Sequence, residues 1–258
     1  GMSFISARTA ACEETFSSDN IITTPNDTLG VEYIAAASRL YANMNFLSIA
    51  RLHSTHDCKE ISGRFASACG IRSLIHDKSN FENFVPSPAM DIFKTALVEG
   101  RYTNIENLET AILFKLRSMS RDDFSNLPDL SEGLENRIYM VSRTAKSLKE
   151  LYDTIKTKRY SHARIRRIIL SAFLDIKSSY KDAVPSYIRV LACNSTGLEH
   201  INFARLRSEI PIAMRATEIR NDPTFLFECK ATDLYNLGCF NIQDCGEEYK
   251  RGLIKIKH

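Results

Sequence analysis

Cysteine pairs of the kind that bind metals are missing from this sequence. Its seven cysteines are odd in number and scattered, and no two of them form a C-x-x-C pair. That pattern argues against a disulfide framework and against a structural zinc site, and it suits a reduced compartment. Cys229, Cys239 and Cys245 could ligate a metal together with His200, but their spacing matches no standard module. We therefore interpret these cysteines as small buried hydrophobic residues and assign no metal site.

Long apolar runs are missing too. The longest, from Ile168 to Leu174, falls far short of the roughly 20 residues that cross a bilayer. The chain does not open on a charged-then-apolar signal segment, and it contains no internal repeat or low-complexity tract. The sequence therefore predicts a soluble cytoplasmic protein without a membrane partner.

The net charge is small as well, at +3 over 258 residues. With 44% hydrophobic and 25% charged residues, the composition is that of an ordinary globular protein. The length allows one large domain, or two to three small ones, with a real core. A functional signal is therefore expected from local concentrations of charge and not from the total.

One stretch, residues 156–176 (KTKRYSHARIRRIILSAFLDI), concentrates positive charge. Its first twelve positions contain six cations and no carboxylate. The six are Lys156, Lys158, Arg159, Arg164, Arg166 and Arg167. A surface of this kind attracts phosphate groups. A basic helix face is often only solvated, but six cations without a counter-charge repel one another, so we favour nucleic acid or another polyphosphate as the ligand.

The same stretch predicts a helix from Ser161 onward with one buried stripe. The residues of the stripe are Ile165, Ile168, Ile169, Ala172 and Phe173. At roughly 100° per residue, Arg164, Arg167 and Ser171 lie together on the outer side. Packing of the stripe would therefore hold the arginines toward solvent. Tyr160 could stack on an unpaired base, whereas an aromatic residue at the start of a helix more often packs in the core.

The N-terminal residues alternate between helical and extended patterns. We predict a helix over 6–15, a second helix that begins after the Pro25-Asn26-Asp27 turn, and a short strand over 46–51. Ser62 is expected to cap a further helix, RFASACGIRSLI. Residues 78–88 interrupt the pattern and mark the first domain boundary.

Residues 89–180 show five successive helical patterns and no strand, which predicts an all-α bundle. Residues 182–186 (DAVPS) end this region. Beyond them, a strand over 187–193, a helix and a second strand at IPIAM predict a βαβ-like unit with a small parallel pair. The expected fold is therefore mainly α, with domains over 1–85, 86–182 and 183–258.

Six strings of this sequence occur in an order that is similar to a known family. They are PNDTLGVEY (25–33), IARLHSTHD (49–57), ASACGIRSLI (66–75), LSEGLENRI (130–138), KTKRYSHARIRRIIL (156–170) and SYIRVLACNSTG (186–197). The most specific feature is SEGLENRI followed by KTKRY-x-x-x-RI-x-R. On these strings the chain resembles the bacterial tRNA(Met) cytidine acetate ligases, which are nucleotidyltransferase-like.

The resemblance implies an N-terminal domain that uses ATP to convert acetate into acetyl-adenylate. The acetyl group would then pass to N4 of the wobble cytidine of elongator tRNA(Met), which the helical region behind that domain would hold. By the same resemblance, the residues that contact ATP are Asn26, Arg51, Ser67 and Arg72. An amide can read an adenine or ribose edge, and arginine offers a planar fork to phosphate oxygens. Magnesium is expected with ATP in the intact enzyme.

The H-x-G-H motif that the resemblance leads us to expect is not in the sequence. His53-x-x-His56 lacks the glycine and comes too late in the chain. Adenylation needs donors and positive charge where charge develops on the α-phosphate. We therefore assign no catalytic residue, and we expect a piece of a longer protein or a misassigned gene start.

On this interpretation, residues 1–85 are the C-terminal remnant of a nucleotidyltransferase-like α/β domain. Residues 86–182 form a helical RNA-binding bundle, and 183–258 form a small α/β unit packed on it. The chain would be the tRNA-binding and partial ATP-binding portion of an acetate-activating ligase, inactive alone. The alternative is a non-catalytic RNA-binding helical module. A nucleotidyltransferase for a small molecule is a third possibility, but it gives the basic helix no role.

Overall fold

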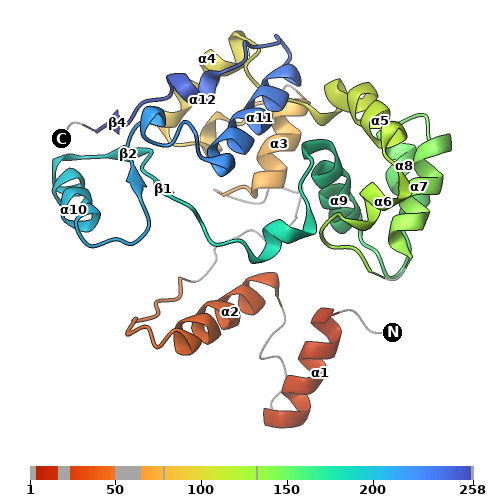
Figure 1. The fold of residues 1–258 in the computed structure, drawn as a ribbon, viewed down its shortest axis with the longest axis horizontal. Coiled ribbons are helices and arrows are strands. Elements are labelled where there is room, and N and C mark those ends of the chain that lie inside the picture. Colours follow the sequence, from red (N-terminus) through yellow and green to blue (C-terminus); the bar gives the residue numbers. More distant parts are fainter. Residues whose placement is uncertain (1–3, 17–23, 50–64, 78, 132, 257–258) are drawn as a thin grey trace. The chain divides into compact units, whose positions relative to one another are not determined.

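The computed structural model describes residues 4–16, 24–49, 65–77, 79–131 and 133–256. The chain divides into two compact units, residues 1–94 and 95–258. Most of the described residues are helical, and the paired strands are short and parallel (Figure 1). The predicted mainly α class is therefore confirmed, whereas the division into three domains remains a prediction.

The described part of the first unit is built of helices. They are α1 (Phe4–Phe16), α2 (Pro25–Arg39), α3 (Ala68–His76), the short 3-10 helix η1 (Glu82–Phe84) and α4 (Ser87–Val98), whose last residues belong to the second unit. The helix predicted over 6–15 is confirmed by α1. Thr24 caps α2, because its Oγ1 accepts from the Asp27 backbone N at 3.2 Å and Asp27 Oδ2 accepts from the Thr24 backbone N at 2.7 Å. Reciprocal bonds of this kind fix where a helix begins.

Three expectations for this unit are corrected. The Pro25-Asn26-Asp27 segment is not a turn before the second helix but the first turn of α2, because Thr24 is the cap. Residues 46–49 of the predicted strand are neither helix nor strand, and residues 50 and 51 lie outside the described residues. An extended segment needs a paired neighbour to satisfy its backbone groups, and the described part of this unit contains no strand. The helix expected over RFASACGIRSLI is confirmed from Ala68, where Ser67 supplies the cap, and Ser62 lies outside the described residues.

In the second unit, helices from residue 105 to residue 174 share one apolar core. They are the 3-10 helix η2 (Ile105–Leu108), α5 (Glu109–Ser118), α6 (Arg121–Ser125), α7 (Leu134–Thr144), α8 (Leu148–Ile155) and α9 (His162–Leu174). Each of α5 to α9 contributes a fully buried apolar side chain, and these include Leu116, Phe124, Ile138, Leu151 and Ile168. Helix α6 was not predicted, because it is too short to show a periodic pattern.

The C-terminal part of the second unit contains parallel strand pairs. β1 (Ile188–Arg189) pairs with β3 (Ile212–Ala213), and α10 (Ser195–Arg205) lies between them in the chain, which confirms the predicted βαβ-like unit. β2 (Ala192–Cys193) pairs with β4 (Ile254–Lys255), a pairing that the sequence patterns did not predict. The other described helices here are η3 (Ser178–Asp182), η4 (Ala216–Glu218), α11 (Pro223–Leu237) and α12 (Glu247–Lys250).

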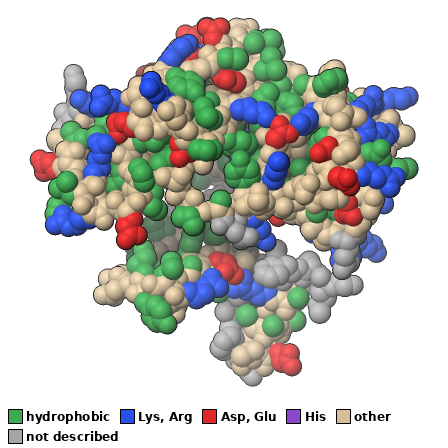
Figure 2. Space-filling view, viewed as in Figure 1, with side chains coloured by type: hydrophobic (Ala, Val, Ile, Leu, Met, Phe, Trp, Pro, Cys, Tyr) green, Lys and Arg blue, Asp and Glu red, His purple; other side chains and the backbone are tan. Residues whose placement is uncertain are grey.

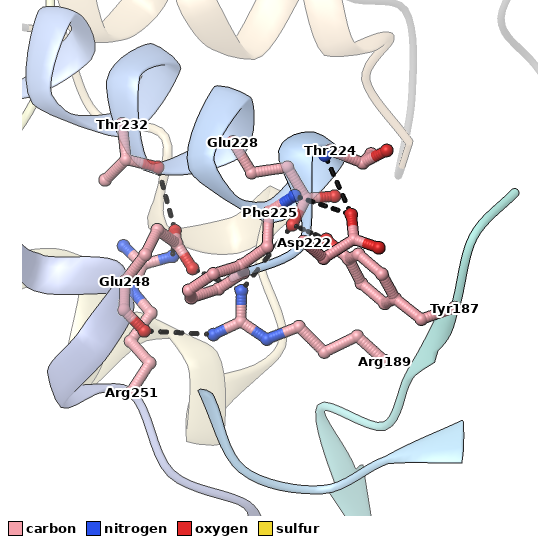
Figure 3. A network of polar contacts seen from close by, with 9 residues as sticks. All are labelled: Tyr187, Arg189, Asp222, Thr224, Phe225, Glu228, Thr232, Glu248 and Arg251. Carbon is pink, nitrogen blue, oxygen red and sulfur yellow. Dashed lines mark hydrogen bonds and ion pairs between the residues drawn. The ribbon is translucent and has the colours of Figure 1, made fainter. Parts of the chain in front are cut away.

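A buried polar network joins β1 to α11 and α12 (Figure 3). Arg189 donates to Glu248, and the two side chains are only 15% and 8% exposed. Burial opposes the ionisation of Glu248, but hydrogen bonds from Thr232 and Arg189 hold the pKa of this carboxyl below its usual value. Tyr187 donates to Glu228 at 2.6 Å. The network therefore gives the SYIR segment a role in holding this part of the fold together.

Candidate nucleic-acid interface

α9 is fixed at its start by a cap and along its length by the core. Ser161 caps it, since its Oγ accepts from the Arg164 backbone N at 3.3 Å. The predicted apolar stripe is buried, with Ile165 and Ile168 fully enclosed. The expectation that Ser171 faces outward is wrong, because Ser171 is buried at 9% exposure. α9 packs against both α5 and α8, so its buried face is wider than a single stripe.

The connection between α8 and α9 is an ordered turn built on Thr157. Thr157 Oγ1 accepts hydrogen bonds from the backbone N of Arg159 and of Tyr160, each at 3.2 Å. A turn of this type fixes the backbone without using charged side chains. Lys156, Lys158 and Arg159 are exposed on it. The first three predicted cations are therefore displayed by a defined turn and not by the helix itself.

Two arginines of α9 share Asp129, which lies in the segment between α6 and α7. Arg167 Nε lies 3.2 Å from Asp129 Oδ2, and the Arg167 side chain is still 63% exposed. Arg164 is half-buried and donates from Nε and Nη2 to the Asp129 carbonyl oxygen at 2.9 and 2.5 Å, and from Nη2 to Ser131 Oγ at 3.1 Å. Arg164 is therefore occupied by the fold, while Arg167 keeps most of its surface open to a ligand.

Arg166 occupies a third position on the helix, facing α8. It is exposed, and its guanidinium carbon lies 5.6 Å from the centre of the Tyr152 ring. Among the described residues, no carboxylate oxygen lies within 4.0 Å of the Arg166 guanidinium. The Tyr152 ring offers it a favourable aromatic face instead. The six predicted cations are thus close along the chain, but they do not form one uniform row.

Tyr160 is part of the core. It is 7% exposed and packs in the same apolar cluster as the stripe of α9. The guanidinium carbons of Arg159 and Arg164 lie 5.8 and 5.4 Å from the centre of its ring. A ring this enclosed has little open face for a base, so the position agrees with the packing alternative given above. Stacking of Tyr160 on RNA stays a prediction that its burial does not favour.

Arg137, which the sequence patterns did not single out, positions the basic turn. Arg137 of α7 donates from Nε to the Ile155 carbonyl oxygen at 3.0 Å and from Nη2 to the Thr154 carbonyl oxygen at 2.5 Å. These carbonyls end α8, where helical backbone acceptors have no partner within the helix. The signal was present in the string LSEGLENRI, which contains Arg137. Arg137 therefore links the string LSEGLENRI to the residues immediately before KTKRY.

The expected ATP contacts fall on separate parts of the first unit. Asn26 is exposed in the first turn of α2. Ser67 is 7% exposed and caps α3, with its Oγ accepting from the Gly70 backbone N at 3.0 Å. Arg72 is exposed on α3, with Nη1 4.0 Å from Cys69 Sγ. Arg51 lies outside the described residues, so the site cannot be assembled from all four.

Metal ligands do not cluster in the part of the chain that the structure describes: no group of three His, Cys, Asp or Glu side chains there could hold an ion. Cys229 and Cys239 are buried as expected, and burial raises the pKa of both thiols. Cys245 is exposed, which corrects its assignment as a buried residue. Among the described residues, no helix has the length and apolar content to cross a membrane.

Residues 1–249 match the family model of the HIGH nucleotidyl transferases. A tRNA(Met) cytidine acetate ligase from Thermosipho africanus (strain TCF52B) is 33% identical over 221 residues, which cover 82% of this chain and 52% of the relative. The enzyme of that name from Thermoanaerobacter sp. (strain X514) is 29% identical over 268 residues, covering 99% and 66%. The chain thus spans about half to two thirds of the length of these curated relatives.

Solved structures of Thermotoga maritima TmcAL have the same fold. The apo form I superposes with a TM-score of 0.87 at 27% identity, covering 99% of this chain and 68% of that one. The form bound with alpha-thio ATP gives a TM-score of 0.84 at 27% identity. The resemblance found in the six strings is confirmed by these relatives. The chain belongs to the HIGH nucleotidyl transferase family.

Proposed function

We propose that this chain is the tRNA-binding and partial ATP-binding portion of an enzyme that activates acetate with ATP. The enzyme would acetylate N4 of the wobble cytidine of elongator tRNA(Met) in the cytoplasm. The relatives that carry the name tRNA(Met) cytidine acetate ligase support this proposal. The solved relative bound with alpha-thio ATP supports a nucleotide site in the same fold.

The observation that carries the RNA part of the proposal is the exposed basic turn and its continuation on α9. Lys156, Lys158, Arg166 and Arg167 expose their charged groups, and Arg159 lies on the same turn. Figure 2 shows Lys and Arg side chains at the edge of the molecule that carries α7 and α8 in Figure 1. Because a turn and a packed helix fix the backbone of these residues, only their side chains need to be ordered when a phosphate chain binds. The helices from α5 to α9 would then act as the RNA-binding bundle.

For the nucleotide, we propose that Asn26, Arg51, Ser67 and Arg72 contact ATP, with magnesium on its phosphates. Arg72 is exposed and has a guanidinium suited to phosphate oxygens. The Ser67 hydroxyl accepts the capping bond from the Gly70 backbone N, so the start of α3 fixes its position. The reaction of acetate with ATP would also need hydrogen-bond donors at the α-phosphate. The H-x-G-H motif expected to supply them does not occur in this sequence.

The proposal is tested by mass spectrometry of tRNA nucleosides from cells with and without the gene. We expect N4-acetylcytidine in elongator tRNA(Met) to disappear when the gene is deleted and to return on complementation. If the nucleoside persists in the deletion strain, the assigned reaction is wrong.

A non-catalytic RNA-binding module is the second candidate. It is favoured by the combination of an exposed basic turn with a sequence that has no H-x-G-H motif. This candidate would be supported over the first if the protein binds tRNA but deletion of its gene leaves the N4-acetylcytidine content of tRNA unchanged.

A further inference from the structure

A groove lies beside the basic turn, between η2 with α5 on one side and α8 with α9 on the other. Its floor contains Ile112 and Ile169, which are each 1% exposed. Ile105 and Leu170 form its rim and are 41% and 43% exposed. The groove therefore has an apolar floor and a partly apolar rim, which is how sites for small planar ligands are commonly built.

One wall of the groove combines an aromatic ring with a guanidinium. Tyr152 is half-buried and packs against the core, and burial raises the pKa of its phenol. The Arg166 guanidinium lies 5.6 Å from the centre of the Tyr152 ring. Both groups are planar, and unpaired RNA bases stack on surfaces of these two types.

The polar groups of the groove do not suit a phosphate. Glu106, Glu109 and Asp153 line it together with His162 and Lys149. Glu109 is engaged, since its Oε2 accepts from the Leu148 backbone N at 2.7 Å. Asp153 lies 3.1 Å from Lys149 Nζ and 3.6 Å from His162 Nε2. The three carboxylates outnumber the lining cations Lys149 and Arg166, which disfavours a phosphate in the groove, whereas a carboxylate can accept a hydrogen bond from the amino group of a base.

Cations stand at the edge of the groove where the phosphates next to such a base would lie. Lys149 is 89% exposed at its side chain. Lys156, four residues after Tyr152, is the exposed C-cap of α8 and begins the basic turn. Arg166 is shared between the groove wall and the basic segment.

We propose that this groove receives one unpaired nucleobase with an exocyclic amino group (cytosine, adenine or guanine) from the RNA whose phosphates lie on the basic turn. The proposal rests on the RNA binding proposed above. The base lies against Tyr152 and Arg166, and its amino group donates to a carboxylate of the opposite side.

The test uses the full chain and fluorescein-labelled oligocytidylate, oligouridylate and a strand of the same length without bases. Tyr152→Leu keeps apolar volume against the core but removes the ring. We expect it to weaken oligocytidylate binding about tenfold and to leave the base-free strand unchanged, because stacking on one aromatic ring is lost. Tyr152→Phe keeps the ring and is expected to bind like the wild type. Wild-type protein is expected to prefer oligocytidylate to oligouridylate.

Phe114→Leu is the matched control, because Phe114 is 74% exposed on α5 and does not line the groove. Thermal unfolding of each variant checks folding. The groove proposal is overturned if Tyr152→Leu binds oligocytidylate as tightly as the wild type, if it weakens the base-free strand equally, or if the wild type does not distinguish cytidylate from uridylate. If the RNA-binding proposal itself is wrong, the result is different: none of the three strands would bind the wild type in a salt-dependent way.

Discussion

Arg117 of α5 and Arg143 of α7 each donate to carbonyl oxygens at the C-terminal end of the other's helix. Arg117 reaches the Ser142 and Ala145 carbonyls at 3.2 and 2.7 Å. Arg143 donates from Nη2 to the Met119 carbonyl at 2.6 Å, and from Nη1 to the carbonyl of Arg117 itself. Cations near helix C-termini donate to carbonyl oxygens that have no partner within the helix, and they interact favourably with the negative end of the helix dipole. These arginines are therefore structural, although their charge alone would suggest RNA contacts.

Replacing Arg143 by Met should lower the free energy of unfolding by about 1–3 kcal/mol, because partly buried carbonyls lose a charged donor. Urea denaturation followed by circular dichroism measures this loss. RNA affinity of the folded variant should not change. Lys146→Met, at an exposed position just beyond α7, is the control and should change stability little. A weaker RNA complex with unchanged stability would show that Arg143 contacts the ligand instead.

Breaking the Arg189–Glu248 pair should be costly. Arg189→Met leaves Glu248, which is 8% exposed, without its main charged partner, and we expect a loss of about 3–5 kcal/mol. Arg251→Met is the matched control, since Arg251 lies 3.1 Å from the same carboxylate but is 63% exposed, and surface pairs contribute about 0–1 kcal/mol. Equal losses from the two variants in urea titrations would contradict this assignment.

The same carboxyl should make stability depend on pH. The pKa of Glu248 is held below its ordinary value of 4.5 in the folded protein. Its contribution to stability is therefore complete above about pH 4.5 and is lost as the pH falls through the lower, folded value. Glu248→Gln should be less stable at neutral pH and should lose less stability on acidification than the wild type. Parallel curves of stability against pH for the two proteins would rule this out.

The chain by itself should not form acetyl-adenylate. The donors expected from an H-x-G-H motif are not in its sequence, and adenylation depends on charge placed at the α-phosphate. Acetate-dependent exchange of pyrophosphate into ATP is the measurement, with a full-length relative as the positive control. Exchange above background with this chain would overturn the expectation.

Local sequence patterns predicted those features that local physics determines. The apolar spacing around Ile165 and Ile168 located α9 and its buried face, and Ser161 marked its first turn, because helix periodicity and capping act within a few residues. The parallel pairing of β1 with β3 also followed from the order strand, helix, strand.

The partners of the cations could not be predicted in the same way. Arg164 and Arg167 contact Asp129, which lies 35 and 38 residues earlier in the chain, and Arg137 caps a helix that it does not belong to. Sequence spacing predicts contacts between neighbours on one helix, whereas these contacts depend on how several helices pack. The prediction that Ser171 faces outward was wrong for the same reason, since α9 is covered on two sides.

The exposed cations of the basic turn and α9 are the central element of the proposed tRNA interface. Filter binding of tRNA over a range of salt concentrations tests this directly for the wild type and for Lys158→Glu with Arg167→Glu. Arg220→Glu, an exposed charge reversal in another part of the second unit, is the control. We predict that the double variant binds more weakly and that its slope of log affinity against log salt is lower by about 0.7–0.9 for each phosphate group that the protein no longer neutralises. Affinity and slope equal to those of the control would show that this surface is only solvated.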